Sequence, residues 1–142
     1  MQGKVSTTRL YLLRLVYLLT AVVVGVGAWP EVVRRSGNPE DLIGGIAFSI
    51  YAAYSLLMLL GAWIPLRMLP LVLLQLIYKS IWIVGIGIPQ WRSGHSGAVR
   101  STIEFFAVIV VLDLVAIPWP YAFDHYLRAA AKREKADLSV HA

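Results

Sequence analysis

Residues 66 to 88 read LRMLPLVLLQLIYKSIWIVGIGI, an apolar run that follows Pro65 and ends at Pro89. The run is longer than the ~20 apolar residues that a helix needs to cross the hydrocarbon core of a bilayer. Further runs of this kind lie at about 10–29, 42–63 and 103–119. The sequence therefore predicts an all-α membrane protein, in which residues 1–123 form a bundle of four transmembrane helices.

The composition agrees with this prediction. The 142 residues are 58% hydrophobic and 15% charged, with a mean hydropathy of +0.69, which is too apolar for an ordinary soluble domain. The absence of cysteine excludes disulfides, thiolate metal sites and cysteine nucleophiles. The net charge of +5 does not indicate nucleic-acid binding, because most Lys and Arg residues flank the apolar runs. We expect the lipid bilayer as partner, and no nucleic acid, cofactor or metal.

Basic residues are about twice as numerous on one side of the predicted spans as on the other. The richer side holds both chain ends and the turn around Arg67, whereas the other side holds Arg34, Arg35, Arg92 and Arg100. The positive-inside rule therefore predicts that both termini are cytoplasmic. Residues 124–142 are expected to form a basic cytoplasmic tail that is partly helical.

Prolines and capping residues predict where the helices begin and end. Pro30 and Pro89 are expected to end the first and third spans. Asn38 before Pro39 predicts the N-cap of the second span, and Ser101 with Glu104 has the spacing of a capping box for the fourth. Four tryptophans fall at span ends, where we expect them to anchor in the headgroup region: Trp29, Trp63, Trp91 and Trp119.

The segment LYLLRLVY at 10–17 resembles LVLLQLIY at 71–78, which suggests two tandem helical hairpins related by duplication. Under this alignment Arg14 is the counterpart of Gln75, and Tyr17 is the counterpart of Tyr78. Both pairs would then face a common centre. The alternative is that leucine-rich helices match by chance and carry such residues wherever a partner can be reached.

Two charged residues fall deep inside predicted spans. A charge at the bilayer centre costs ~2.5 to 3.5 kcal/mol on insertion scales, so it normally faces the bundle interior and finds a partner. From the helical rise, Lys79 and Asp113 lie within about 5 Å of each other in depth, on neighbouring antiparallel helices. We therefore predict an ion pair between Lys79 and Asp113.

The face of the third span that carries Lys79 is polar and aromatic, because helical spacing places Gln75, Tyr78 and Trp82 beside it. A strip of small residues on the second span is expected to pack against this face: Gly45, Ser49, Ala52 and Ala53. Arg14 either extends to the interface or turns inward to join the cluster. The candidate binding residues are thus Arg14, Gln75, Tyr78, Lys79, Trp82 and Asp113, and we assign no catalytic residue.

The size, the four spans, the paired hairpins and the Leu10-x-Leu-Leu-Arg14-Leu pattern resemble the DoxX-like families of small bacterial four-helix inner-membrane proteins. The resemblance implies the four-helix architecture and the inner-membrane location. It implies no chemistry and no site residues.

The leading hypothesis for function is a non-enzymatic structural or binding component, alone, as a homo-oligomer or in a larger membrane complex, whose cluster holds the helices together. One alternative is a small transporter or channel subunit for protons, ions or a small polar solute. Another is an enzyme that acts on a lipid-like substrate, with Asp113 or Glu104 as base and Tyr78 as donor. A cavity beside these groups would favour this last hypothesis, and a solidly packed bundle would disfavour it.

Overall fold

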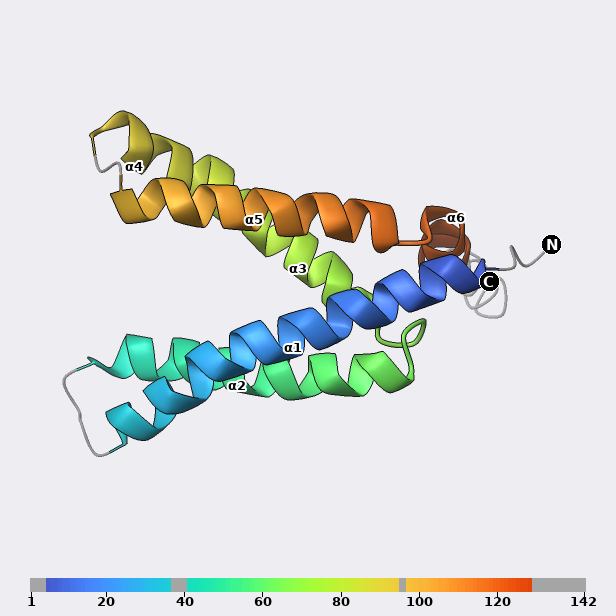
Figure 1. The fold of residues 1–142 in the computed structure, drawn as a ribbon, viewed down its shortest axis with the longest axis horizontal. Helices are drawn as coiled ribbons and strands as arrows, with labels where there is room; N and C mark the ends of the chain where they lie inside the picture. Colours follow the sequence, from blue (N-terminus) through green and yellow to red (C-terminus); the bar gives the residue numbers. More distant parts are fainter. Residues whose placement is uncertain (1–4, 37–40, 95–96, 129–142) are drawn as a thin grey trace, which may run out of the picture.

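The computed structural model describes residues 5–36, 41–94 and 97–128, which are helical throughout apart from turns and contain no strand. The all-helical prediction is confirmed for this part of the chain. Figure 1 shows the long helices and the short segments that extend them. The elements are α1 (Thr7–Arg35), α2 (Leu42–Trp63), α3 (Leu69–Trp82), the π-helical η2 (Ile83–Gly87), α4 (Ile88–Arg92), α5 (Gly97–Ala116), α6 (Trp119–Ala122) and the π-helical η3 (Phe123–Arg128).

Several of these helices are long and apolar enough to cross a membrane. In the described residues they are Thr7–Arg35, Leu42–Trp63 and the continuous stretch Leu69–Arg92. A fourth crossing is present if α5 and the segment Trp119–Tyr126, which meet at a bend of 74°, form one span. The composition and the helices together are consistent with an integral membrane protein.

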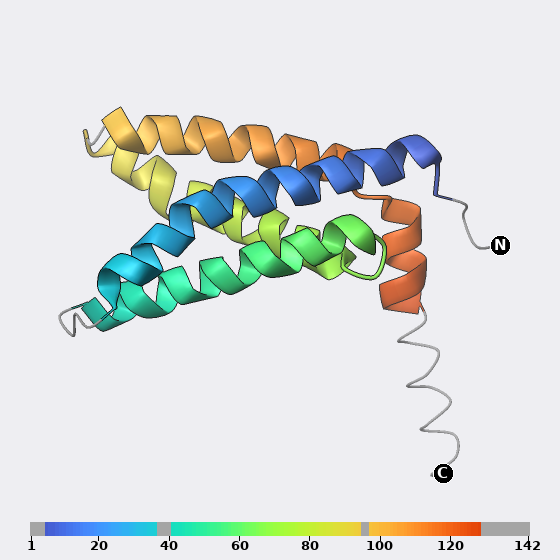
Figure 2. The same cartoon turned by 60° about the horizontal axis from the view of Figure 1, so that its bottom comes forward.

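The helices form two antiparallel pairs, α1 with α2 and α3 with α5 (Figures 1 and 2). The pairs lie close together where α1 begins, where α2 ends, where α3 begins and where α6 lies, and we call this the narrow end. They diverge towards α4, the end of α1 and the start of α2, which we call the splayed end. This divergence positions the candidate site.

The narrow end is tightly packed by side chains from all the long helices. The Tyr17 hydroxyl donates a hydrogen bond to the Pro65 carbonyl at 2.9 Å, and the Tyr126 hydroxyl donates to the Leu66 carbonyl at 3.2 Å. Gly61 lies directly against the Tyr17 ring, where a Cβ would find no room. Fully buried apolar side chains complete this core: Leu13, Met58, Leu69, Val72 and Ile117.

Both prolines that were expected to end helices lie inside them. α1 continues through Pro30 to Arg35, and α4 contains Pro89 in its first turn, so the prediction that the helices end at these prolines is wrong. A proline removes only one backbone donor, and in transmembrane helices its effect is readily accommodated. The second span, by contrast, has the predicted bounds 42–63.

The predicted caps also differ from the observed ones. Asp41 caps α2 by accepting a hydrogen bond from the Gly44 amide at 2.8 Å, whereas Asn38 lies outside the described residues. α5 already begins at Gly97, and Ser101 lies within it. The Ser101 hydroxyl donates a hydrogen bond to the Gly97 carbonyl at 3.4 Å. The predicted capping box is therefore wrong, since Glu104 lies about two turns inside the helix and pairs with Arg100.

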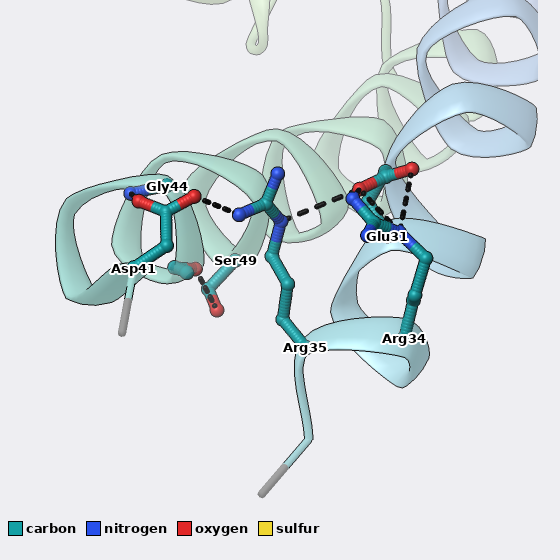
Figure 3. Close-up of polar contacts among 7 residues, drawn as sticks. Glu31, Arg34, Arg35, Asp41, Gly44 and Ser49 are labelled. Atoms are coloured by element: carbon teal, nitrogen blue, oxygen red, sulfur yellow. Dashed lines mark hydrogen bonds and ion pairs between the residues drawn. The ribbon is translucent and has the colours of Figure 1, made fainter. Parts of the chain in front are cut away.

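A group of ion pairs joins the end of α1 to the start of α2 (Figure 3). Arg35 lies between Glu31, at 3.3 Å, and Asp41, and Arg34 also pairs with Glu31 at 2.5 Å. The Gly44 amide, followed by the Arg35 guanidinium, holds the pKa of the Asp41 carboxyl below its usual value. These groups are partly or largely exposed, so they fix the geometry of the hairpin more than they stabilise it.

Candidate binding site

A buried chain of hydrogen bonds joins α2, α3 and α5. The Gln75 amide nitrogen donates to both carboxylate oxygens of Asp113, at 3.0 and 3.1 Å. The Tyr54 hydroxyl lies 3.2 Å from the Gln75 amide oxygen and 3.1 Å from the Leu71 carbonyl. Gln75 and Asp113 are fully buried. Buried polar groups of this kind fix the relative position of helices in a membrane, where no water is present to replace a lost partner.

The predicted ion pair between Lys79 and Asp113 is wrong, because none of the ion pairs between described residues joins them. The Lys79 ammonium instead donates to the Tyr78 hydroxyl at 3.0 Å. It also lies over the rings of Tyr78 and Phe106, 4.9 and 5.2 Å from their centroids. The physical reason is that Gln75, one turn before Lys79, already holds the Asp113 carboxylate.

Aromatic rings surround the Lys79 ammonium and bring Trp82 into the cluster. Phe106 makes edge-to-face contacts with Trp82, at 5.1 Å between centroids, and with Tyr78, at 6.4 Å. Phe106 was missed by the sequence analysis. Its position two helical turns before Asp113, on the same face of α5, is the pattern that could have indicated it.

Arg14 lies outside this cluster. It is exposed on α1, with its guanidinium 6.0 Å from the centroid of the Tyr11 ring. The inward face of α1 carries Leu13, Tyr17 and Thr20, and helical geometry turns Arg14 away from that face. The expectation that Arg14 and Gln75 face a common centre is therefore wrong.

The small residues of α2 also differ from expectation. Ala52 is buried, but Ser49 and Ala53 are exposed and face away from the interior, because α2 packs mainly against α1. The Trp29 indole, expected only as an anchor, donates to the Ser55 hydroxyl of α2 at 3.3 Å. Trp63 and Trp91 are exposed near helix ends, as an interfacial position requires.

A cavity of about 320 Å³ lies between the two helical hairpins, α1 with α2 and α3 with α5, beside Lys79. It is partly open, and all four long helices contribute to it. Most of its lining is apolar, and Lys79 is its one charged side chain among the described residues. The lining residues are Leu19, Thr20, Val23, Val24, Gly27, Ala28, Phe48, Tyr51, Tyr78, Lys79, Phe105, Phe106 and Ile109.

The site therefore has two parts with different chemistry. Tyr54, Gln75 and Asp113 form a closed chain that does not line the cavity. Lys79 and Tyr78 present a cation and a hydroxyl to the cavity itself. In the described residues there is no group of three or more His, Cys, Asp or Glu side chains that could hold a metal ion.

No family model, curated protein or solved structure matches this chain. The resemblance to the DoxX-like families stays a prediction. The function must accordingly be argued from the geometry of the cavity and the charges beside it.

Proposed function

We propose that this protein is a non-enzymatic membrane component that binds a membrane-soluble molecule in the cavity between its two hairpins. The observation that carries the proposal is a buried ammonium, that of Lys79, among otherwise apolar walls. Ligand sites commonly combine a mostly apolar lining with a few polar groups that orient the ligand. A bundle held together only for structural reasons has no need of such a space.

Binding fits the cavity better than catalysis does. A cavity beside the polar cluster favours a lipid-like ligand, as an enzyme of this kind would also require. However, among the described residues that line it there is neither of the carboxylates expected to act as base, Asp113 and Glu104. Asp113 is sealed behind Gln75, and Glu104 is exposed and paired with Arg100 at 2.8 Å. We therefore assign the cavity a binding role.

Loss of the cavity tests this role. Gly27 lines the cavity and has open space around its Cβ position, so Gly27→Phe is expected to fill the cavity without a clash. Gly85→Phe is the matched control, since Gly85 has equal space but lies outside the lining. Small molecules that co-purify in polymer nanodiscs should be retained by the wild type and the control, and lost from Gly27→Phe. An identical set from all three proteins would contradict the proposal.

We also propose that both termini lie in the cytoplasm, on the strength of the Lys and Arg distribution. An inner-membrane location is part of the same proposal, because the resemblance to the DoxX-like families implies it. The cavity would then open towards the outer half of the membrane. Because the chain has no cysteine, single cysteines at Ser6 and Ser36 can report the orientation without background. A membrane-impermeant maleimide should label Ser36→Cys in intact cells and Ser6→Cys only after lysis. The reverse pattern would overturn this orientation.

Transport is the second candidate, because the cavity ends at Lys79 while the narrow end beyond it is closed by fully buried side chains. A site that is open on one side and sealed on the other is what one state of a transporter requires. The polar chain of Gln75 and Asp113 lies at this closure. Proteoliposomes should then show a proton or ion flux that Asp113→Asn reduces. A flux that is unchanged by Asp113→Asn would exclude this candidate.

A further inference from the structure

The Lys79 ammonium is buried at the cavity with most of its hydrogen-bonding capacity unused. Its side chain is 2% exposed, and an ammonium carries three donors. In the described residues its one hydrogen-bond acceptor is the Tyr78 hydroxyl, at 3.0 Å. That hydroxyl donates its own proton to no other described residue. Two donor groups, the Lys79 ammonium and the Tyr78 hydroxyl, therefore lie side by side at the cavity wall without an acceptor among the described residues.

From these two donor groups we propose that the ligand is a compact, membrane-soluble monocarboxylic acid. Its two carboxylate oxygens bind the Lys79 ammonium and the Tyr78 hydroxyl. This inference rests on the proposed binding function of the cavity. A carboxylate offers two adjacent acceptor oxygens and one negative charge, which matches this pair of donors.

The charges around the cavity favour a single anionic group. The rings of Tyr78 and Phe106 stabilise the Lys79 cation without neutralising it. Asp113, the nearby carboxylate, is fully buried, is held by Gln75 and does not line the cavity. An anion that enters the cavity therefore reaches Lys79 without passing another carboxylate. A phosphate monoester, which carries up to two charges, would bury a second charge that no described residue of the lining neutralises.

The walls of the cavity favour a small ring system. Five aromatic side chains line it: Phe48, Tyr51, Tyr78, Phe105 and Phe106. Aromatic rings pack well against one another in edge-to-face and offset arrangements. A volume of about 320 Å³ is near the lower end of the range for small-molecule pockets, which suits a compact ligand better than a lipid with two acyl chains.

In a membrane, the polar group of the ligand determines which ligand the cavity prefers. Lipid tails are as apolar as the cavity walls, so moving an apolar molecule from the bilayer into the cavity gains no hydrophobic free energy. Preference among ligands of equal shape must then come from polar contacts. A carboxylate that receives a charge-assisted hydrogen bond from Lys79 should outcompete a neutral analogue with the same ring.

The test compares naphthoate with naphthylmethanol, which share a ring system and differ in charge. Binding to the full chain in nanodiscs is measured by equilibrium dialysis against empty nanodiscs, which corrects for partitioning into lipid. The wild type should bind naphthoate about tenfold more tightly or better. Lys79→Met should remove this preference, and Lys79→Arg should keep it. Arg67→Met is the matched control, because it removes an exposed positive charge outside the cavity lining.

The outcomes separate this inference from the proposed function. Equal binding of both probes to the wild type, or a preference that survives in Lys79→Met, would overturn the carboxylic acid while leaving a ligand-binding cavity. Binding of neither probe would also overturn it, and the Gly27→Phe comparison would then decide whether the cavity binds anything. Circular dichroism and gel filtration establish that each variant is folded, and retention of the preference by Lys79→Arg excludes a loss caused by misfolding alone.

Discussion

The Gln75 amide nitrogen lies 3.0 and 3.1 Å from the two carboxylate oxygens of Asp113, so an uncharged donor holds the buried acid of α5. The same amide accepts from Tyr54, which makes Gln75 the residue that connects three helices. The nearest buried cation, Lys79, is thereby left to face the cavity. The Gln75 amide thus separates the chain of Tyr54, Gln75 and Asp113 from the pair of Lys79 and Tyr78 that lines the cavity.

Replacement of Gln75 should destabilise the fold. Gln75→Leu leaves the Asp113 carboxylate and the Tyr54 hydroxyl without their shared partner, which costs about 1 to 3 kcal/mol for a buried group. The measurement is the free energy of unfolding in mixed detergent micelles. Gln90→Leu, at an exposed glutamine, is the control and should change the stability by less than about 0.5 kcal/mol. Equal effects of the two substitutions would contradict the role of Gln75.

Double-mutant cycles should rank the interactions of Asp113. Since Gln75 contacts Asp113 and Lys79 makes no ion pair with it, the coupling energy of Gln75 with Asp113 should lie within about 0.5 to 3 kcal/mol. The coupling of Lys79 with Asp113 should be smaller. The cycles use leucine at each position and unfolding in the same micelles. A larger coupling for Lys79 would restore the direct ion pair that the sequence predicted.

Gly61 should tolerate no side chain. Its Cβ position coincides with the Tyr17 ring, which is fully buried and fixed by its hydrogen bond to Pro65. Gly61→Ala should therefore destabilise the protein by about 1 to 3 kcal/mol through overpacking. Gly45→Ala, on the same helix with open space at its Cβ position, should be neutral or stabilising. Thermal unfolding of both variants measures the difference, and equal melting temperatures would rule out this close contact.

The start of α2 should weaken in acid. The pKa of Asp41 is lowered below 3.8, first by the Gly44 amide and then by Arg35. Its contribution to the stability of the first turn of α2 is therefore present above about pH 4. It is lost as the pH falls through the lowered pKa, when the carboxyl takes up a proton. Hydrogen exchange of the Gly44 amide should accelerate over this range beyond the intrinsic dependence. Asp41→Asn keeps a capping side chain and should abolish the acid-induced step, so a step that persists in this variant would contradict the assignment.

The sequence predicted the helices well and their rotation poorly. The length of each apolar run predicts that a helix is present there. α2 has its predicted bounds because Asp41 and Pro65 flank it. The expectation that Lys79 and Asp113 turn towards the interior is confirmed, since both are buried. However, a helix that is apolar on all sides has no periodic face, so the outward direction of Arg14 could not be read from its neighbours.

The contacts within the site were the least predictable part. Whether Asp113 pairs with Lys79 or with Gln75 depends on side-chain rotation over one helical turn, which spacing alone does not determine. The cavity arises because the two hairpins diverge, and no local pattern in either hairpin reports the angle between them.

The placement of the Lys79 partner on its own helix bears on how the chain enters the membrane during synthesis. α3 emerges from the ribosome before α5, so Lys79 leaves the ribosome before Asp113 does. Tyr78 arrives with it as the acceptor for its ammonium group. Insertion of this charged helix therefore does not have to wait for a partner from the second half of the protein.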